Sequence, residues 1–228
     1  MICFDRVSKR YPNGREALSG LSFEVADGEM LFLTGRSGAG KSTVLKLIAL
    51  LERPTRGALT VNGVNTAKLP ARRIPLFRRG LGIVFQDHRL LMDRPVFDNV
   101  ALPLIVADVS FKEIDRRVRA ALDQVGLLGK ERAVPLELSI GEQQRVGIAR
   151  AVVTKPPLLI ADEPTGNLDA TLAAEVMGLF RRFNDVGVTV MIATHDLPLV
   201  RESGLREITL EAGSIDALAM LPAIAATR

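Results

Sequence analysis

The chain has 228 residues, of which 47% are apolar and 25% charged, and this length and composition are typical of a globular protein with a full hydrophobic core. Its net charge of +4 is a mild excess of 30 basic over 26 acidic residues, and the arginine pairs are scattered, which argues against a nucleic-acid interface. A weaker interpretation of the same charge is attraction to an anionic membrane surface. The single cysteine, Cys3, excludes an internal disulfide, and no apolar run approaches the ~20 residues that cross a bilayer.

Several short strands are predicted in the N-terminal part of the chain. Apolar residues alternate with polar ones near residues 2–7 and 21–25, and two further strands are expected at 30–33 and 58–61. Turns are expected at Asn13-Gly14, Asp27-Gly28 and Asn62-Gly63.

A glycine-rich stretch, Gly-Arg-Ser-Gly-Ala-Gly-Lys-Ser, lies between the strand at 30–33 and a helical run at 43–51. It fits the phosphate-loop pattern, in which glycines let backbone N–H groups point at a polyphosphate, a lysine adds charge and a hydroxyl binds Mg²⁺. The competing interpretation is a glycine-rich turn that caps an ordinary helix. The strand and helix on either side favour a nucleotide site, made by Gly35, Arg36, Ser37, Gly38, Ala39, Gly40, Lys41, Ser42 and Thr43.

The middle of the chain changes from strands to helices. After a buried strand at 81–85, apolar residues recur at helical spacing within 96–106, 114–125 and 146–153. Ser110 is a candidate N-cap, with Glu113 placed as its capping-box partner. A strand at 158–161, a helix at 170–185, a strand at 188–193, a short helix and a strand at 207–211 follow, and residues 212–228 are expected to be a tail. This alternation predicts an α/β fold with a mainly parallel sheet covered on both faces.

Polar side chains follow several of these strands. Gln86 follows the strand at 81–85, Asp162 and Glu163 end the next one, and His195 follows the strand at 188–193. In parallel sheets, ligands bind at the carboxyl ends of the strands, so we expect these groups to act with Lys41 on one nucleotide. Asp162 would hold Mg²⁺, Glu163 would polarise the attacking water, Gln86 would reach the metal or the water, and His195 would face the γ-phosphate. His88 is expected on a surface loop without a role.

Leu138-Ser139-Ile140-Gly141-Glu142-Gln143-Gln144 opens a further helix. With the phosphate loop, it makes residues 1 to about 211 resemble the nucleotide-binding subunits of ATP-binding cassette (ABC) transporters. The resemblance implies a role for each motif in turn: Tyr11 stacks on adenine, 35–42 is the Walker A loop, Gln86 the Q-loop, 139–143 the signature, 158–163 the Walker B strand, 167–169 the D-loop and His195 the switch histidine.

The resemblance also implies the architecture and the assembly. We expect one domain, 1–228, of the P-loop NTPase fold of ABC ATPases: a mainly parallel core sheet, an N-terminal antiparallel β-subdomain and a helical subdomain inserted at about 87–155. Two copies would sandwich two ATP molecules, with Ser139, Gly141 and Glu142 of one copy contacting the nucleotide of the other. Family members usually have glycine where this chain has Ile140, so we expect closure of the dimer to be weakened but not abolished.

A finer resemblance is to cell-division ATP-binding proteins of the FtsE type, through residues 30–35, 85–94 and 142–153. It implies an integral membrane partner of the FtsX kind that docks near residues 89–103 and regulates cell-wall hydrolases. The location implied is the cytoplasmic face of the bacterial inner membrane, at the division septum. Residues 162–169 are similar to lipoprotein-releasing and macrolide-efflux ATPases as well, so these remain the alternative. A chromosome-organising ATPase would need a long coiled coil and a GTPase an Asn-Lys-x-Asp motif, and the sequence contains neither.

Overall fold

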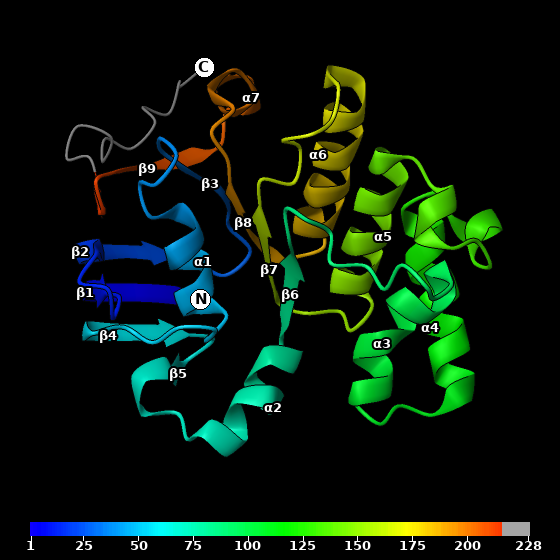
Figure 1. The fold of residues 1–228 in the computed structure, drawn as a ribbon, viewed down its shortest axis with the longest axis horizontal. Coiled ribbons are helices and arrows are strands. Elements are labelled where there is room, and N and C mark those ends of the chain that lie inside the picture. Colours follow the sequence, from blue (N-terminus) through cyan, green and yellow to red (C-terminus); the bar gives the residue numbers. More distant parts are fainter. Residues whose placement is uncertain (216–228) are drawn as a thin grey trace. The chain divides into compact units, whose positions relative to one another are not determined.

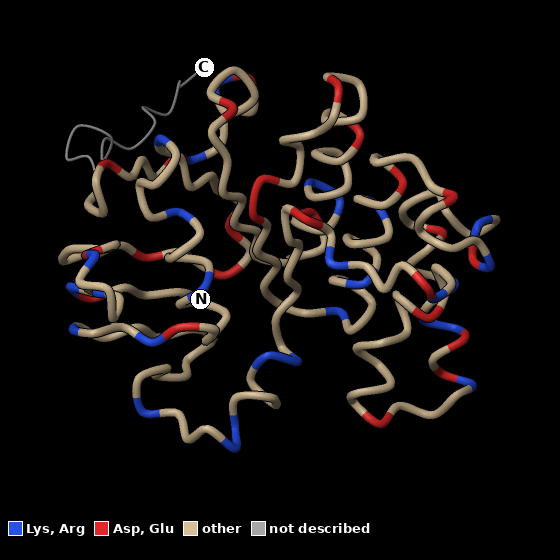
Figure 2. The backbone as a smooth tube through the Cα atoms, in the orientation of Figure 1, with Lys and Arg blue, Asp and Glu red and all other residues tan. Residues whose placement is uncertain are grey.

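The computed structural model describes residues 1–215 and divides the chain into two compact units (Figure 1). The first unit contains residues 1–74 and, among the described residues, 189–215; the second contains 75–188. The second unit therefore includes more residues than the helical insertion expected at about 87–155, because two strands also belong to it. Figure 2 shows basic and acidic residues interspersed along both units.

The first unit begins with an antiparallel sheet whose strand order is β2-β1-β4-β5. Its strands are β1 (Ile2–Arg10), β2 (Glu16–Val25), β4 (Arg56–Val61) and β5 (Val64–Asn65). Phe4 of β1 pairs with Phe23 of β2, and their rings stack with centroids 4.5 Å apart. The alternating residues of these strands are buried, as the sequence pattern predicts, because one face of the sheet covers the core.

The same unit contains a parallel group of strands: β3 (Met30–Thr34) lies between β8 (Thr189–Ala193) and β9 (Arg206–Glu211). Every residue of β3 and β8 is buried, which explains why both read as continuous apolar runs. Helices α1 (Lys41–Ile48) and α7 (Leu197–Ser203) belong to this unit. Strand β10 (Ser214–Ile215) pairs with β9 within the segment expected to be a tail, and residues 216–228 of that segment lie outside the described part.

The segment between β5 and the next strand forms three short elements that the sequence analysis did not predict. Two are single-turn 3₁₀ helices, Thr66–Lys68 and Ala71–Arg73, and the third is α2 (Ile74–Arg79). None of the residues of α2 is buried, so no apolar periodicity marks it in the sequence.

The second unit combines two parallel strands with four long helices. Strands β6 (Leu81–Val84) and β7 (Leu158–Asp162) pair with each other, with Leu81 opposite Leu158. The helices are α3 (Val96–Val106), α4 (Phe111–Gln124), α5 (Ile140–Val152) and α6 (Ala170–Asp185), and two single-turn 3₁₀ helices, Leu128–Lys130 and Pro135–Glu137, precede α5. Helix α5 packs against α3, α4 and β6, so it is the central helix of this unit.

The predicted capping box of α4 is wrong. Ser110 occupies the N-cap position, but its side chain accepts no hydrogen bond from the first turn. Glu113 instead accepts hydrogen bonds from Arg116, at 2.7 and 2.9 Å, and from Arg117, at 2.6 Å. Arginines three and four residues further along a helix lie on the same face, so they compete for the carboxylate.

Among residues 1–215, no helix combines the length and the apolar character that a membrane span requires.

Candidate nucleotide site

The phosphate loop of the first unit connects β3 to α1, and three of its glycines have positive φ: Gly35 at 137°, Gly38 at 81° and Gly40 at 114°. At Gly35 a Cβ atom would lie 2.3 Å from the carbonyl oxygen of Leu210, and at Gly40 it would lie 2.7 Å from the side chain of Leu18. Both contacts are shorter than real Cβ atoms tolerate. The loop therefore requires glycine for its backbone angles and for the space around it.

Lys41 begins α1 and is buried, with its Nζ donating a hydrogen bond to the carbonyl oxygen of Gly35 at 2.7 Å. No side chain caps the start of α1. The positive end of the helix dipole and the Lys41 ammonium therefore both lie at the phosphate loop, which suits a polyphosphate.

Two other predicted residues belong to the same unit. The Tyr11 hydroxyl lies 3.4 Å from the Thr43 hydroxyl, so the β1–β2 turn brings the predicted adenine-stacking ring to the start of α1. His195 is exposed and follows β8, where the Thr194 N–H donates to the carbonyl oxygen of Leu33 at 3.1 Å. Because β3 and β8 are parallel neighbours, His195 and the phosphate loop follow the same edge of the sheet.

Arg15 is a residue at this loop that the sequence analysis missed. Its guanidinium donates a hydrogen bond to the carbonyl oxygen of Gly38 at 3.3 Å. Arg15 lies in the β1–β2 connection, and no motif or periodicity distinguishes it from other surface arginines.

The Walker B residues belong to the second unit. Four residues of β7 are buried and the fifth, Asp162, is half-buried; Glu163 follows with φ at 48°. Val84 of β6 pairs with Ala161 of β7, so Gln86, which follows β6, and the two carboxylates follow the same ends of neighbouring strands. The structure therefore places Gln86, Asp162 and Glu163 at one edge of this strand pair.

The signature residues form the N-terminus of α5. Ser139 is the N-cap: its hydroxyl accepts from the Glu142 N–H at 3.3 Å, and the Glu142 carboxylate accepts from the Ser139 N–H at 2.9 Å. Lys130 adds an ion pair with Glu142 at 2.5 Å. Lys130 and the Ser139 N–H lower the pKa of Glu142 to about 2. Glu142 therefore stabilises the start of the signature helix, a role that the sequence analysis did not assign to it.

Ile140 and Gly141 occupy different surroundings within this first turn. The Ile140 side chain is 56% exposed, so it requires no space in the core. Gly141 is buried, and a Cβ there would lie 3.0 Å from Cδ1 of Leu172, in the first turn of α6. Asp169 of the predicted D-loop is the N-cap of α6 and accepts from the Leu172 N–H at 2.9 Å. The starts of α5 and α6 therefore pack against each other at Gly141.

The oxygen donors of the predicted metal ligands suit Mg²⁺, since Ser42, Gln86 and Asp162 offer a hydroxyl, an amide and a carboxylate. The part of the chain that the structure describes contains no cluster of three or more His, Cys, Asp or Glu side chains placed to hold a metal ion. Mg²⁺ is commonly bound by one or two carboxylates together with substrate phosphates, so such a cluster is not required.

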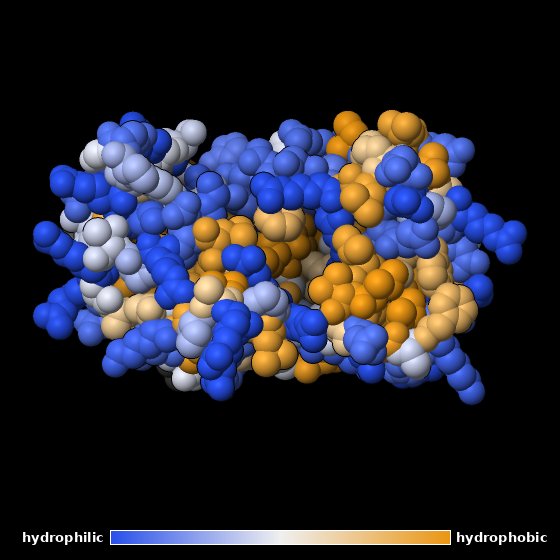
Figure 3. Space-filling model, turned by 60° about the horizontal axis from the view of Figure 1, so that its bottom comes forward, coloured by the Kyte–Doolittle hydropathy of each residue, from blue (hydrophilic) through white to orange (hydrophobic). Residues whose placement is uncertain are grey.

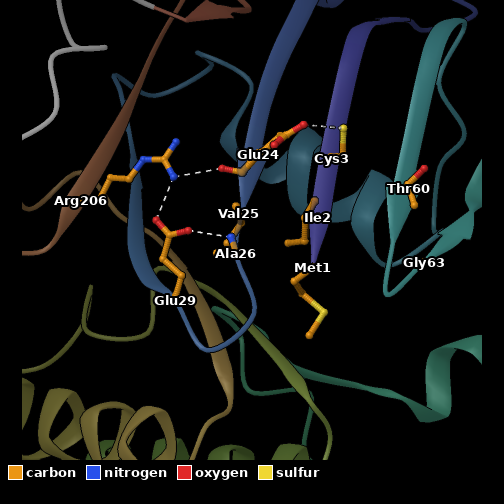
Figure 4. Close-up of a pocket in the computed structure, with 10 residues that line it drawn as sticks. All are labelled: Met1, Ile2, Cys3, Glu24, Val25, Ala26, Glu29, Thr60, Gly63 and Arg206. Atoms are coloured by element: carbon orange, nitrogen blue, oxygen red, sulfur yellow. Dashed lines mark hydrogen bonds and ion pairs between the residues drawn. The ribbon is translucent and has the colours of Figure 1, made fainter.

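The first unit also contains a cavity of about 590 Å³, whose lining residues are shown in Figure 4. It is near the start of β3, whereas the phosphate loop follows the end of β3. Arg206 in its wall pairs with Glu29 at 2.8 Å, and burial and Glu24 raise the pKa of the Cys3 thiol. Arg206 and Glu29 pair with each other and the Glu24 carboxylate accepts from the Cys3 thiol, so we assign the cavity no part in the nucleotide site.

The family model described as ABC transporter matches residues 18–166. The chain belongs to the ABC transporter family and is an ATPase of the ATP-binding cassette class.

Within that family, the chain is similar to the cell division ATP-binding protein FtsE of Escherichia coli (strain K12), with 56% identity over 94% of this chain and 97% of that protein. It is 50% identical to the protein of the same name from Haemophilus influenzae, over 93% of this chain and 98% of that one. Among solved structures, the dimeric post-hydrolysis state of the ATP-binding cassette MJ0796 bound to ADP and Pi has a TM-score of 0.87 and 34% identity, covering 95% of this chain and 97% of that one. The predicted family and α/β fold are confirmed.

Proposed function

We propose that the chain is the ATP-hydrolysing subunit of a membrane complex that acts in bacterial cell division. The observation that carries the chemistry is the phosphate loop, in which Gly35 and Gly40 cannot be replaced without a steric clash and Lys41 lies at the loop. The similarity to FtsE proteins over almost the whole chain carries the biological role.

In this proposal, the predicted site residues act on one ATP molecule. The loop residues 35–43 bind the phosphates, Tyr11 stacks on adenine, and Ser42, Gln86 and Asp162 hold Mg²⁺. When bound, Mg²⁺ neutralises charge that develops on the phosphate oxygens. Glu163 accepts a proton from the attacking water, while Lys41 and His195 stabilise the γ-phosphoryl group as it transfers. Binding and positioning, rather than covalent chemistry, supply the rate enhancement.

We further propose that the active form is a homodimer in which Ser139, Gly141 and Glu142 of one copy face the nucleotide of the other. Support comes from the dimeric cassettes among the structural relatives and from the exposed position of Ser139. Ile140, which is exposed beside Ser139, would hold the two copies slightly apart. An Ile140→Gly variant is therefore expected to hydrolyse ATP several-fold faster in a steady-state phosphate-release assay. Equal or slower turnover would contradict this role for Ile140.

The membrane partner in this proposal is an FtsX-like integral protein that docks near residues 89–103, and it would hold the chain at the cytoplasmic face of the inner membrane, at the septum. Leu91 and Met92 in this segment are each 41% exposed, and Leu102 is 38% exposed. Figure 3 shows apolar side chains gathered on the surface formed by α3 and α4. Exposed apolar side chains are typical of surfaces that bind another protein.

The test of the chemistry is a Glu163→Gln variant. Without the carboxylate base it is expected to bind ATP normally, to lose at least 100-fold in turnover, and to accumulate a dimer with ATP bound, measured by phosphate release and by size-exclusion chromatography. Glu16→Gln, at an exposed position in β2, is the matched control and should keep full turnover. Normal hydrolysis by Glu163→Gln would exclude Glu163 as the base.

The test of the biological role is to identify the membrane protein that co-purifies with the chain. Recovery of an FtsX-like protein would support the cell-division role. Recovery of a lipoprotein-releasing or macrolide-efflux permease would replace it with that alternative, while leaving the ATPase chemistry intact.

A further inference from the structure

The loop that follows Gln86 has an unusual backbone. His88 and Arg89, which are consecutive, have φ angles of 54° and 48°. Side chains other than glycine rarely adopt this conformation, and they keep it only where the surroundings enforce it. His88 was expected on a surface loop, but it is half-buried. Burial lowers the pKa of its imidazole, and a hydrogen bond with Gln144 raises it by a smaller amount. The loop is therefore held against the body of its unit.

Contacts within the loop account for part of this conformation. The Arg89 guanidinium pairs with the Asp87 carboxylate at 3.2 Å and lies 4.1 Å from the centre of the Phe85 ring. Both partners are neighbours in sequence, so these contacts tighten the loop without fixing it to another element.

Arg150 of α5 supplies the connection from outside the loop. Its guanidinium donates hydrogen bonds to the carbonyl oxygens of His88, at 2.5 Å, and of Arg89, at 2.7 Å. These are the two residues with left-handed backbones. Burial and the neighbouring Arg89 lower the pKa of Arg150, and the Asp87 carboxylate opposes them with a smaller effect. An arginine side chain stays charged, so its buried N–H groups depend on these two carbonyls.

Helix α5 carries Arg150 on a rigid support. Val146, Ile148 and Ala149 are fully buried, and Gly147 is buried as well. A Cβ on Gly147 would lie 4.0 Å from the His88 carbonyl oxygen, so the loop packs directly on this helix. The N-cap of the same helix is the signature residue Ser139, and the eleven residue steps from Ser139 to Arg150 span roughly 16 Å. A rigid-body displacement of α5 at its signature end would therefore also move the groups that contact residues 88 and 89, just after Gln86.

We propose that Arg150 is a positioning residue, which fixes the backbone of residues 88–89 to α5 and thereby sets Gln86 relative to the signature helix. The inference rests on the proposed function of Gln86 in hydrolysis. Arg150 contacts no nucleotide in this proposal, so its loss affects the rate of hydrolysis and not the binding of ATP, which the phosphate loop performs.

The experiment compares Arg150→Met and Arg150→Lys with Arg145→Met, all in the full chain. Arg145 lies on the same helix, and its guanidinium pairs with Glu175 of α6 at 2.9 Å instead of binding the loop carbonyls, so it is the matched control. We expect Arg150→Met to lower kcat at least tenfold with the KM for ATP within twofold of the parent. Arg150→Lys, which can still donate to a carbonyl, should recover part of the rate, and Arg145→Met should stay within twofold.

Amide hydrogen exchange of residues 87–91 supplies a readout that does not depend on catalysis. Loss of protection in Arg150→Met, but not in Arg145→Met, is the expected result. Parent-like kcat or parent-like protection in Arg150→Met would overturn the proposal, as would a parallel loss of kcat and ATP affinity or an Arg150→Lys no better than Arg150→Met.

A Gln86→Ala variant separates this inference from the proposed function. If Gln86→Ala keeps full turnover, Gln86 has no role in hydrolysis. That result would contradict the proposed function, even if the exchange data show that Arg150 fixes the loop. If Gln86→Ala is slow, the total loss of kcat in the Gln86→Ala, Arg150→Met double variant should be smaller than the product of the two single losses, because both changes act through Gln86. Full additivity would show that Arg150 acts elsewhere and would overturn the proposal.

Discussion

The phosphate loop and the loop after Gln86 both leave a parallel strand through residues with left-handed backbones, but they are restrained in different ways. In the phosphate loop these residues are glycines, which adopt positive φ without a steric penalty. In the loop after Gln86 they are His88 and Arg89, and their carbonyls are bound by Arg150, more than sixty residues away in the chain. One loop is specified locally by its own residues, whereas the other depends on a contact from a different helix.

This difference suits the functions that we propose for the two loops. A loop that binds phosphates benefits from being preformed, because binding then loses no free energy to ordering the loop. The other loop follows Gln86, a proposed Mg²⁺ ligand, and lies at the start of the proposed partner surface. Such a loop should respond to the movement of another element, and the long-range hydrogen bonds from Arg150 provide this response.

The largest expected effect is that of Gly35→Ala, which breaks the locally specified loop. Its Cβ would lie 2.3 Å from the Leu210 carbonyl oxygen at a φ of 137°, so either the loop or β9 must move. We expect ATP affinity to fall at least 100-fold and the free energy of unfolding to fall by about 1–3 kcal/mol, measured by titration with labelled nucleotide and by thermal unfolding.

Gly20→Ala is the matched control for Gly35→Ala. Gly20 also has a positive φ, 63°, but a Cβ there would have no atom within 4 Å. The Gly20→Ala variant is expected to lose about 1 kcal/mol in the free energy of unfolding through backbone strain alone, and its ATP affinity should be unchanged. Equal effects of the two substitutions on ATP binding would contradict the steric explanation.

The contrast between local and long-range restraint also explains what could be predicted from the sequence. The phosphate loop and the buried strands could be predicted, because their glycines and apolar periods are properties of contiguous residues. The role of Arg150 could not, since nothing within α5 indicates that its guanidinium binds the carbonyls of residues 88 and 89. Arg15 at the phosphate loop and the exposed helix α2 were missed for the same reason: neither carries a local pattern.

The two Ser-x-x-Glu helix starts show that even a local pattern can be decided by its neighbours. At α5 the capping box is formed, because the Glu142 carboxylate accepts from the Ser139 N–H and pairs with Lys130 at the same time. At α4 the capping box is not formed. Arg116 and Arg117, at the third and fourth positions after Glu113, donate hydrogen bonds to the Glu113 carboxylate and lower its pKa to about 2. The sequence pattern is the same, so the difference lies in which cations are within reach.

The smallest expected effect sharpens this second comparison. Ser139→Ala removes a hydroxyl that accepts a hydrogen bond and should cost about 1 kcal/mol in the free energy of unfolding. Ser110→Ala removes a hydroxyl that accepts none from α4, so its cost should be within about 0.5 kcal/mol of zero, measured by urea denaturation of both variants. Equal costs at the two positions would mean that Ser110 caps α4 in solution after all. In that case the arginines after Glu113 would not be what keeps the capping box of α4 open.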